Sequence, residues 1–483
     1  MAEHNEVKNN QISENSSALS NNTINEYEAD EEAIAENAIE KEELPLQRTS
    51  TKVSFFNERF TAHRILLVWK FLKIYLIISI GCLSVFSIYW GSMYQRETRL
   101  KNLRMLVVIE DDQTIDSVPP LFGNQIKEVL ETKEAKELGD WHIYNSTEFS
   151  KIAQRHNNNS IEQEVMRQIH HQNYWSSIYI KQSATYNLYN AIIDGDSSYN
   201  VSNSSILSYY ETGRDIIATA QYVTPSIETI ERMFLDRNNI TQSLINIIGN
   251  IPNNQNSLQV LAQSLQFQFY DMRPSTSSVL IAPLQIGLLY MIIVTFFQFQ
   301  FFADLHMGVV KVLKGKHYLM YRLFTSIFSY FIISLMFSLV TLAFQVDFTV
   351  TFGKSGFLVY WMVSFLTMTA VGTMNEIAAL LLIPIYPPLL GFWLIFWVII
   401  NITPTFTPLA LCPEFFRYGY ALPLHNSYEI SKVVFLNTWK GQFGRNIGII
   451  IAWDVVLVVS QPFIIILFGK QMAKKMQKAA KKK

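Results

Sequence analysis

The sequence predicts a multi-pass α-helical membrane protein with six transmembrane helices and a large extracytoplasmic α/β domain between helices 1 and 2. Composition gives the first indication, because 49% of the 483 residues are hydrophobic and only 16% are charged. Several apolar runs also reach the ~20 residues that a helix needs to cross the hydrocarbon core of a bilayer. A polar, charge-mixed segment at residues 95–278 separates the first run from the others and is long enough to fold as a domain.

The first transmembrane helix is predicted at residues 64–94. Arg64 and Lys70 stand near its beginning, and aromatic residues stand at its end. Cations favour the cytosolic flank of a span and aromatic rings favour the interfaces, so the N-terminus is expected in the cytosol. The first 50 residues are rich in acidic and polar side chains and nearly free of aromatic ones. Such a composition cannot bury enough apolar surface to fold, so residues 1–63 are predicted to be an acidic, disordered cytosolic tail.

Residues 95–278 are predicted to form the extracytoplasmic α/β domain. The segments LRMLVVIEDD, WHIYN and WSSIYI are typical of strands, whereas QIKEVLETKEAKEL and SIEQEVMRQIHHQNY are typical of helices. The domain also carries five N-x-S/T acceptors, which predict a glycoprotein in which at least one acceptor is used. The acceptor asparagines are Asn145, Asn158, Asn200, Asn203 and Asn239.

Five further helices are predicted in a membrane domain at residues 279–469. The apolar runs lie at 280–302, 323–344, 357–382, 389–401 and 447–468. A second division ends the fourth helix near Met374 and begins the fifth at Ile377, and the sequence alone does not choose between the two. Both divisions give six transmembrane helices.

Basic residues predict the cytosolic side of this membrane domain. The connection between the second and third helices carries Lys311, Lys314, Lys316 and Arg322. Residues 470–483 are lysine-rich and are predicted to be a basic cytosolic tail. Because cytosolic connections carry an excess of Lys and Arg, both termini are predicted in the cytosol.

A proline-rich external elbow is predicted at residues 403–423, between the fifth and sixth helices. Its prolines Pro404, Pro408 and Pro413 cannot continue a helix. Irregular backbone at membrane depth is tolerated only where neighbouring protein shields it, so we expect the elbow to dip back into the outer leaflet beside other helices. Glu414 and Arg417 are three residues apart in this elbow and are placed to form an ion pair.

Two acidic residues are the candidate polar sites within the membrane. Ionisable groups inside a span are costly unless they are paired or wetted, so they are functional candidates. Asp454 lies about two turns into the sixth helix, where it is expected either to make an interhelical contact or to line a polar groove. Glu376 is expected either late in the fourth helix or in the turn that follows it.

The order of these segments resembles the membrane subunits of type-2 ABC exporters, and among them the phage-infection-protein branch. The sequence is most similar to the fungal nitrosoguanidine-resistance membrane protein family, on the segments LVVIEDD, SSIYIKQSATYNLYNAI, SYYETGRD and GYALPLHNSYE. The resemblance covers residues 65 to 470. It implies a plasma-membrane protein, with an endomembrane location as the alternative. It further implies drug or mutagen resistance through export of amphiphilic compounds or control of phospholipid distribution between leaflets, and a homodimer by analogy.

The sequence holds no motif of a nucleotide-hydrolysing or hydrolytic enzyme. FGKSG ends like a P-loop, but Phe348 occupies the position where the first glycine of that motif is required. We therefore expect no enzyme, no cofactor, no metal site and no nucleic-acid partner, the expected partners being membrane lipids and an amphiphilic drug or phospholipid. The alternative function is a non-transporting regulator or partner subunit of a separate pump or flippase.

Overall fold

The computed structural model describes residues 55–56, 60–156, 158–237, 239–249, 254–275 and 277–481. The chain divides into two units, residues 1–77 and 78–483, and each is described by itself. Helix α2 (Thr61–Met93) begins in the first unit and ends in the second. Most of the predicted cytosolic tail at 1–63 lies outside the described residues.

A five-stranded sheet follows α2 in the second unit, with the strand order β2-β1-β3-β4-β5. The pairs β1–β2, β1–β3 and β4–β5 are parallel, and β3–β4 is antiparallel. The strands are β1 (Arg104–Ile109), β2 (Asp140–Asn145), β3 (Ser177–Ile180), β4 (Ile206–Tyr210) and β5 (Gln268–Asp271). The first three strands coincide with the segments LRMLVVIEDD, WHIYN and WSSIYI, whereas no pattern predicted β4 or β5.

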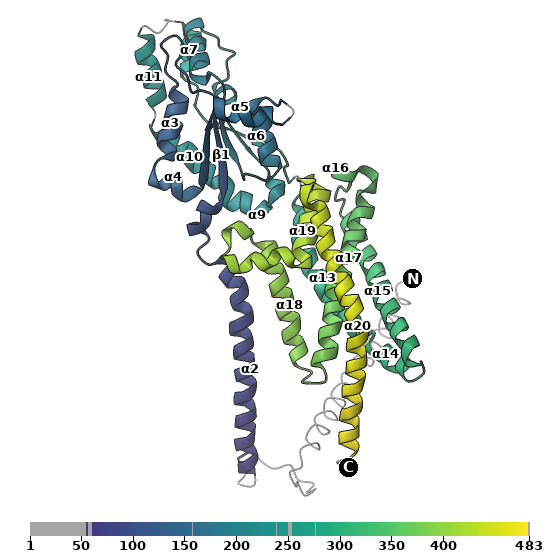
Figure 1. Ribbon diagram of the computed structural model, residues 1–483. Helices are drawn as coiled ribbons and strands as arrows, with labels where there is room; N and C mark the ends of the chain where they lie inside the picture. Colours follow the sequence, from purple (N-terminus) through teal and green to yellow (C-terminus); the bar gives the residue numbers. More distant parts are fainter. Residues whose placement is uncertain are drawn as a thin grey trace, which may run out of the picture. The chain divides into compact units, whose positions relative to one another are not determined.

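Helices cover both faces of the sheet (Figure 1). Successive side chains of β1 point to opposite faces, so Met105 and Val107 enter one hydrophobic core while Leu106 and Val108 enter the other. This is why the middle of β1 is an unbroken apolar run and not an alternating one. The longer helices of this region are α3 (Leu121–Leu130), α4 (Lys133–Leu138), α5 (Ser146–Gln154), α6 (Ile161–His170), α7 (Ala184–Asp194), α8 (Val201–Ser205), α10 (Thr224–Arg237), α11 (Asn239–Ile248) and α12 (Gln255–Leu261).

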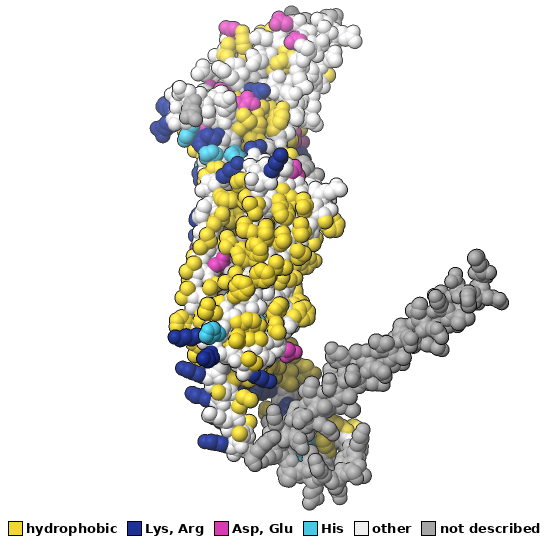
Figure 2. All heavy atoms as spheres, turned by 90° about the vertical axis from the view of Figure 1, so that its right-hand side faces the viewer, with side chains coloured by type: hydrophobic (Ala, Val, Ile, Leu, Met, Phe, Trp, Pro, Cys, Tyr) yellow, Lys and Arg dark blue, Asp and Glu magenta, His cyan; other side chains and the backbone are white. Residues whose placement is uncertain are grey.

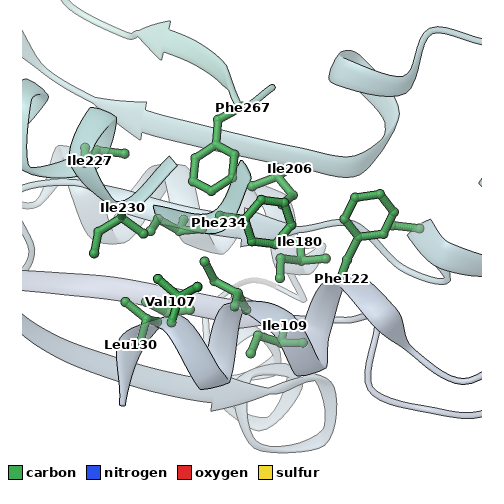
Figure 3. Close-up of a cluster of buried hydrophobic side chains, with 14 of the residues drawn as sticks. Val107, Ile109, Phe122, Leu130, Ile180, Ile206, Ile227, Ile230, Phe234 and Phe267 are labelled. Carbon is green, nitrogen blue, oxygen red and sulfur yellow. The ribbon is translucent and has the colours of Figure 1, made fainter. Parts of the chain in front are cut away.

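The larger core lies between the sheet and helices α3 and α10 (Figure 3). Phe234 from α10 stacks on Phe122 from α3, with ring centroids 6.3 Å apart, and meets Phe267 edge-on at 5.5 Å. All three rings are buried, and full burial of one such side chain stabilises a fold by about 1.5–3 kcal/mol. The Phe122–Phe234 contact joins residues that are more than a hundred positions apart, and this cluster holds α3 and α10 on the sheet.

Six helices of the described chain are long and apolar enough to cross a membrane. The chain is therefore a multi-pass helical membrane protein. The six candidates extend over Thr61–Met93, Ser278–Val310, Gly315–Ala343, Thr349–Leu382, Leu389–Phe406 and Lys440–Ala480. Their main helices after α2 are α13 (Gly287–Phe301), α14 (Ala303–Val310), α15 (Gly315–Ala343), α16 (Thr349–Phe352), α17 (Gly356–Leu382), α18 (Leu389–Phe406) and α20 (Phe443–Ala480).

The structure also chooses between the two divisions of the fourth and fifth helices. Helix α17 runs without a break to Leu382, and α18 begins at Leu389 after the prolines of the connecting turn. The division near Met374 is therefore wrong. Helix α20 continues through most of the predicted basic tail, because lysine and alanine are good helix formers.

An apolar belt covers one face of the helices of the second unit. Figure 2 shows hydrophobic side chains covering the middle of one face, with Lys and Arg gathered toward both ends. Exposed apolar residues of α15 such as Phe328 and Met336 belong to this belt. The C-terminal end of α20 lies at the end of the helices away from the sheet (Figure 1). An exposed apolar belt of this extent is expected of a surface that contacts lipid.

The elbow contains two short turns and leads into a buried helix. These segments lie at the ends of the spans that are nearest the sheet (Figure 1). The turns are η8 (Leu409–Leu411) and η9 (Glu414–Ala421), and the helix is α19 (Pro423–Leu436). Pro408 and Pro413 directly precede the two turns, and Pro423 occupies the first position of α19, where its missing N–H costs nothing. The sequence did not predict α19, although nearly all of its side chains are buried.

One expectation about the elbow is corrected by the structure. Pro404 lies inside α18, which ends at Phe406 and not at Asn401. Proline in a helix leaves a carbonyl of the preceding turn without its usual N–H partner. The affected carbonyl here is that of Ile400. Threonine hydroxyls bond the carbonyls on either side of it, since Thr403 donates to Ile399 O at 2.6 Å and Thr405 donates to Asn401 O at 3.0 Å.

Candidate functional site

A buried ion pair lies within the membrane domain. Glu376 of α17 forms an ion pair with the Arg322 guanidinium of α15, and only 2% and 3% of the two side chains are exposed. The hydroxyl of Ser326, one turn along α15, donates to Glu376 Oε2 at 2.9 Å. Glu376 therefore lies inside the fourth span and not in the turn after it. Arg322, expected among the basic residues of a cytosolic connection, is its buried partner.

A neutral polar network lies next to this ion pair on α17. Asn375 Nδ2 donates to Ile292 O of α13 at 3.1 Å, and its Oδ1 accepts from Trp393 Nε1 of α18 at 3.2 Å. One asparagine thus bonds two neighbouring helices. An amide buried in an apolar medium costs several kcal/mol unless it is satisfied, so Asn375 fixes the arrangement of α13, α17 and α18.

Asp454 is the second acidic residue buried in the membrane domain. It lies on the face of α20 that also buries Asn446, Ile450, Leu457 and Gln461. It is 9% exposed, and neither of its carboxylate oxygens has a hydrogen-bond partner among the described atoms. No ion pair to Asp454 occurs in the described part of the chain. The specific interhelical hydrogen bond expected of Asp454 is therefore absent from these residues, and a buried, unpartnered carboxyl remains.

We call residues 95–278, which contain the five-stranded sheet, the sheet domain. A cavity of about 380 Å³ lies where the sheet domain, the elbow and helices α19 and α20 meet. We call it the junction cavity. Trp175 and Arg214 line it from the sheet domain, Pro404 and Tyr420 from the elbow region, Lys432 from α19 and Arg445 from α20. Lys432 Nζ donates to Arg214 O at 2.6 Å, which ties α19 to the sheet domain. His425 Nδ1 lies 2.9 Å from Pro404 O and ties α19 to the end of α18.

Each carboxylate of the junction cavity has partners in the protein itself. Burial acts to raise the pKa of Glu429, but Lys432, 2.8 Å away, together with His425 and Arg214 outweighs that effect and holds the pKa below its ordinary value. Burial raises the pKa of Asp215, whose Oδ1 accepts from Ala218 N at 2.8 Å as a helix cap. Burial lowers the pKa of His425, so this imidazole is neutral at physiological pH.

Neither arginine of the cavity lies within ion-pair distance of a described carboxylate, although the charges of Glu429, Glu211 and Asp215 act on Arg214 from farther away. Arg214 stacks over the Trp175 ring at 3.8 Å and donates to Tyr174 O at 2.6 Å. Burial lowers the pKa of Arg214 to about 10, which leaves it charged at neutral pH. Arg445 bonds only the neutral side chains of Gln442 and Asn446 in the described structure. Neither arginine forms an ion pair with a described carboxylate, so the cavity presents two guanidinium groups to an incoming ligand.

The other predicted elbow residues lie outside this cavity, except Pro408. Pro408 lines it with Pro404, whereas Pro413 begins the exposed turn η9. Glu414 and Arg417 in that turn form an ion pair at 3.1 Å, with most of each side chain exposed. An exposed pair of this kind contributes about 0–1 kcal/mol, so it does not determine the path of the elbow.

The predicted glycosylation acceptors have different surroundings. Asn158, Asn200 and Asn203 are exposed, whereas Asn145 is half-buried and caps α5 by accepting from Glu148 N at 2.8 Å. Asn200 likewise caps α8, and the side chain of Asn239 lies outside the described part of the structure. No group of histidines, cysteines and carboxylates suited to a metal ion occurs among the described residues.

Comparison with known proteins identifies the family. A family model matches residues 74–459, which include the sheet, the junction cavity, Glu376 and Asp454. The chain belongs to the family described as "Protein of unknown function (DUF3533)". One relative is an uncharacterized endoplasmic reticulum membrane protein of Saccharomyces cerevisiae, 34% identical over 438 residues, or 88% of this chain and 84% of the relative. No solved structure matches the chain. The chain is thus a member of a fungal membrane protein family.

Sequence reasoning missed most of the charged residues of the DUF3533 chain's cavity. Arg214 stands in SYYETGRD and Glu429 in GYALPLHNSYE, and both segments carried the family resemblance. The resemblance could therefore have marked these two residues as candidates for a functional site. Lys432 and Arg445 lie outside the segments that carried the resemblance, so no such signal marked them. Their convergence depends on α19, whose burial the polar sequence HNSYEISK does not reveal.

Proposed function

We propose that this DUF3533 protein controls the distribution of amphiphilic compounds, phospholipids included, between the two leaflets of its membrane. Resistance to drugs or mutagens is the cellular consequence that we propose. The observation that carries the proposal is Asp454, a carboxyl buried among spans without a partner in the described structure. Carboxyl groups are rare inside membranes because they are costly there, and they commonly mark the path of a polar group or ion.

The neighbouring ion pair supports the same proposal. Helices α15, α17 and α20 pack against one another, so Arg322–Glu376 and Asp454 belong to one helix bundle. A headgroup that crosses the bilayer needs polar groups to replace water along its path. The likeness to type-2 ABC exporters fits this function, and export or passive lipid movement are the two forms that it would take.

We propose a topology with both termini in the cytosol and the sheet domain on the opposite side of the membrane. The exposed lysines near residues 311–316 and after residue 470 support it, since basic residues favour the cytosolic face. The yeast relative is named as an endoplasmic reticulum membrane protein, so a localisation experiment should examine the endoplasmic reticulum first. The plasma membrane is the second location to examine, because the family resemblance implies it.

Purified protein in liposomes tests the proposed function. Phospholipid carrying a fluorophore is reconstituted in both leaflets, and dithionite added outside bleaches the accessible fluorophore. We expect bleaching beyond the outer-leaflet fraction, faster than in protein-free liposomes. Asp454→Asn should slow it, while the neighbouring lipid-facing variant Val455→Ala should not.

Two outcomes would count against the proposal. If wild-type liposomes bleach like protein-free ones, unaided lipid movement is refuted. If an added ATPase subunit then restores movement, the chain acts as the partner subunit of a separate pump. Full activity in a well-folded Asp454→Asn variant would remove this carboxyl from the pathway.

A further inference from the structure

The junction cavity adjoins an apolar groove on the outside of α20. This second hollow is about 480 Å³ and is lined by Tyr420, Ala421, Ile449, Ala452, Trp453 and Val456. Its lining is almost entirely apolar, in contrast to the charged cavity. Tyr420 lines both hollows, so they meet at this residue. We call the second hollow the α20 groove.

One stripe of α20 connects the two hollows. Arg445 lines the junction cavity, and Ile449, Ala452 and Val456 line the α20 groove. These positions follow one another by four, three and four residues, which places them on one face of a helix. A guanidinium thus stands at the membrane-surface end of a strip of apolar side chains that continues into the span.

Two lining residues of the α20 groove, Tyr420 and Trp453, are held in place where the groove meets the elbow. Trp453 Nε1 donates to Ala421 O at 2.7 Å, which attaches the elbow to α20. Tyr420 is held edge-on against His425, with ring centroids 5.4 Å apart. The aromatic rings therefore lie where a charged end and an apolar end of a ligand would meet, as they do at membrane interfaces.

We propose that the junction cavity and the α20 groove together bind one membrane phospholipid, with its phosphate at Arg214 and Arg445 and an acyl chain along α20. Charge complementarity selects an anionic headgroup. The cavity holds three cations, Arg214, Lys432 and Arg445, against two carboxylates, Asp215 and Glu429. The carboxylates already have partners within the protein, whereas the two guanidinium groups are the natural partners of a phosphate.

This inference deepens the proposed function and rests on it only for the biological role of the bound lipid. Binding is measured on detergent-purified, full-length protein, where no lipid crosses a membrane. A lipid that binds without being moved would leave this inference standing and overturn the proposed function. Movement without binding at this site would do the reverse.

Native mass spectrometry of the full-length protein tests the site by titration with phosphatidylserine, phosphatidylcholine and glycerol 3-phosphate. We expect one retained phosphatidylserine per chain, with weaker retention of phosphatidylcholine and little of glycerol 3-phosphate. Arg445→Gln should weaken phosphatidylserine binding about tenfold, the effect of one lost charge-assisted contact. Arg445 is exposed and bonds only neutral side chains, so this variant should fold normally. Arg417→Gln is the matched control, because Arg417 lies in the elbow but outside the cavity.

The groove is tested by filling it. Val456→Trp places a large ring in the lining, whereas Val455→Trp places the same ring on an adjacent exposed position outside it. Only the first should weaken phosphatidylserine binding. Equal effects of Arg445→Gln and Arg417→Gln, or equal binding of the two phospholipids, would overturn the anionic headgroup site. Glycerol 3-phosphate binding as tightly as phosphatidylserine would show a free phosphate site and overturn the role of the groove.

Discussion

The buried pair Arg322–Glu376 gives a quantitative prediction, because its two charges depend on each other. Both side chains are at least 97% buried, so removing one charge leaves the other in an apolar medium without compensation. Breaking such a pair costs about 3–5 kcal/mol, whereas replacing both residues by apolar ones of similar size is nearly neutral. At 1.36 kcal/mol per tenfold change, Glu376→Gln or Arg322→Met should lower the folded-to-unfolded ratio roughly 150- to 5,000-fold.

The assay is unfolding of the purified protein in mixed micelles with increasing SDS. We expect large losses of stability for Arg322→Met and Glu376→Met and a much smaller loss for the double variant. Ser326→Ala, which removes only the hydroxyl bonded to Glu376 Oε2, should cost about 1 kcal/mol. A double variant that loses the sum of the two single losses would refute the coupling between these residues.

Three further predictions concern the elbow, the sheet domain and its surface. A Cβ at Gly419 would lie 2.2 Å from Pro404 Cβ, so Gly419→Ala should destabilise the protein by about 1–3 kcal/mol in the same SDS titration. Gly391→Ala is the control and should not destabilise it, because no atom lies within 4 Å of a Cβ at this position. Equal stabilities of the two variants would contradict the packing described here. Burial acts to raise the pKa of Glu164, but hydrogen bonds from Arg167, Gln168 and Asn159 outweigh it and keep the pKa below 4.5. Its stabilising effect is therefore complete above the unfolded pKa and is lost as the pH falls through the folded pKa, so hydrogen exchange in α6 should rise in acid for the wild type and depend less on pH in Glu164→Gln. Treatment of the protein with an N-glycosidase should increase its gel mobility, and removing Asn158, Asn200 and Asn203 together should abolish most of that shift; an unchanged mobility on treatment would refute a glycosylated sheet domain.

Sequence patterns predicted the features that depend on local composition. The length of the apolar runs predicted the membrane helices, and the apolar segment LRMLVVIEDD predicted the strand β1. Prolines indicated where the chain turns between α18 and α19, although Pro404 itself lies within α18.

The remaining features depend on contacts between distant residues. Arg322 looks like a basic flanking residue until α17 brings Glu376 beside it, more than fifty positions away. Helix α19 is polar in sequence, yet it is buried because the sheet domain, α17 and α18 enclose it. The junction cavity combines residues from five separate stretches of the sequence, 171–175, 214–215, 404–410, 420–432 and 439–445, so no local pattern marks it.

Membrane sidedness is the central claim, because it decides which leaflet faces the junction cavity and the sheet domain. In a chain whose Cys82 and Cys412 are replaced by serine, single cysteines are placed at the exposed positions Lys133 in α4 and Lys475 in α20. Sealed microsomes are then treated with a membrane-impermeant maleimide. The proposed topology predicts labelling at residue 475 at once and at residue 133 only after detergent. Immediate labelling at residue 133 would contradict it.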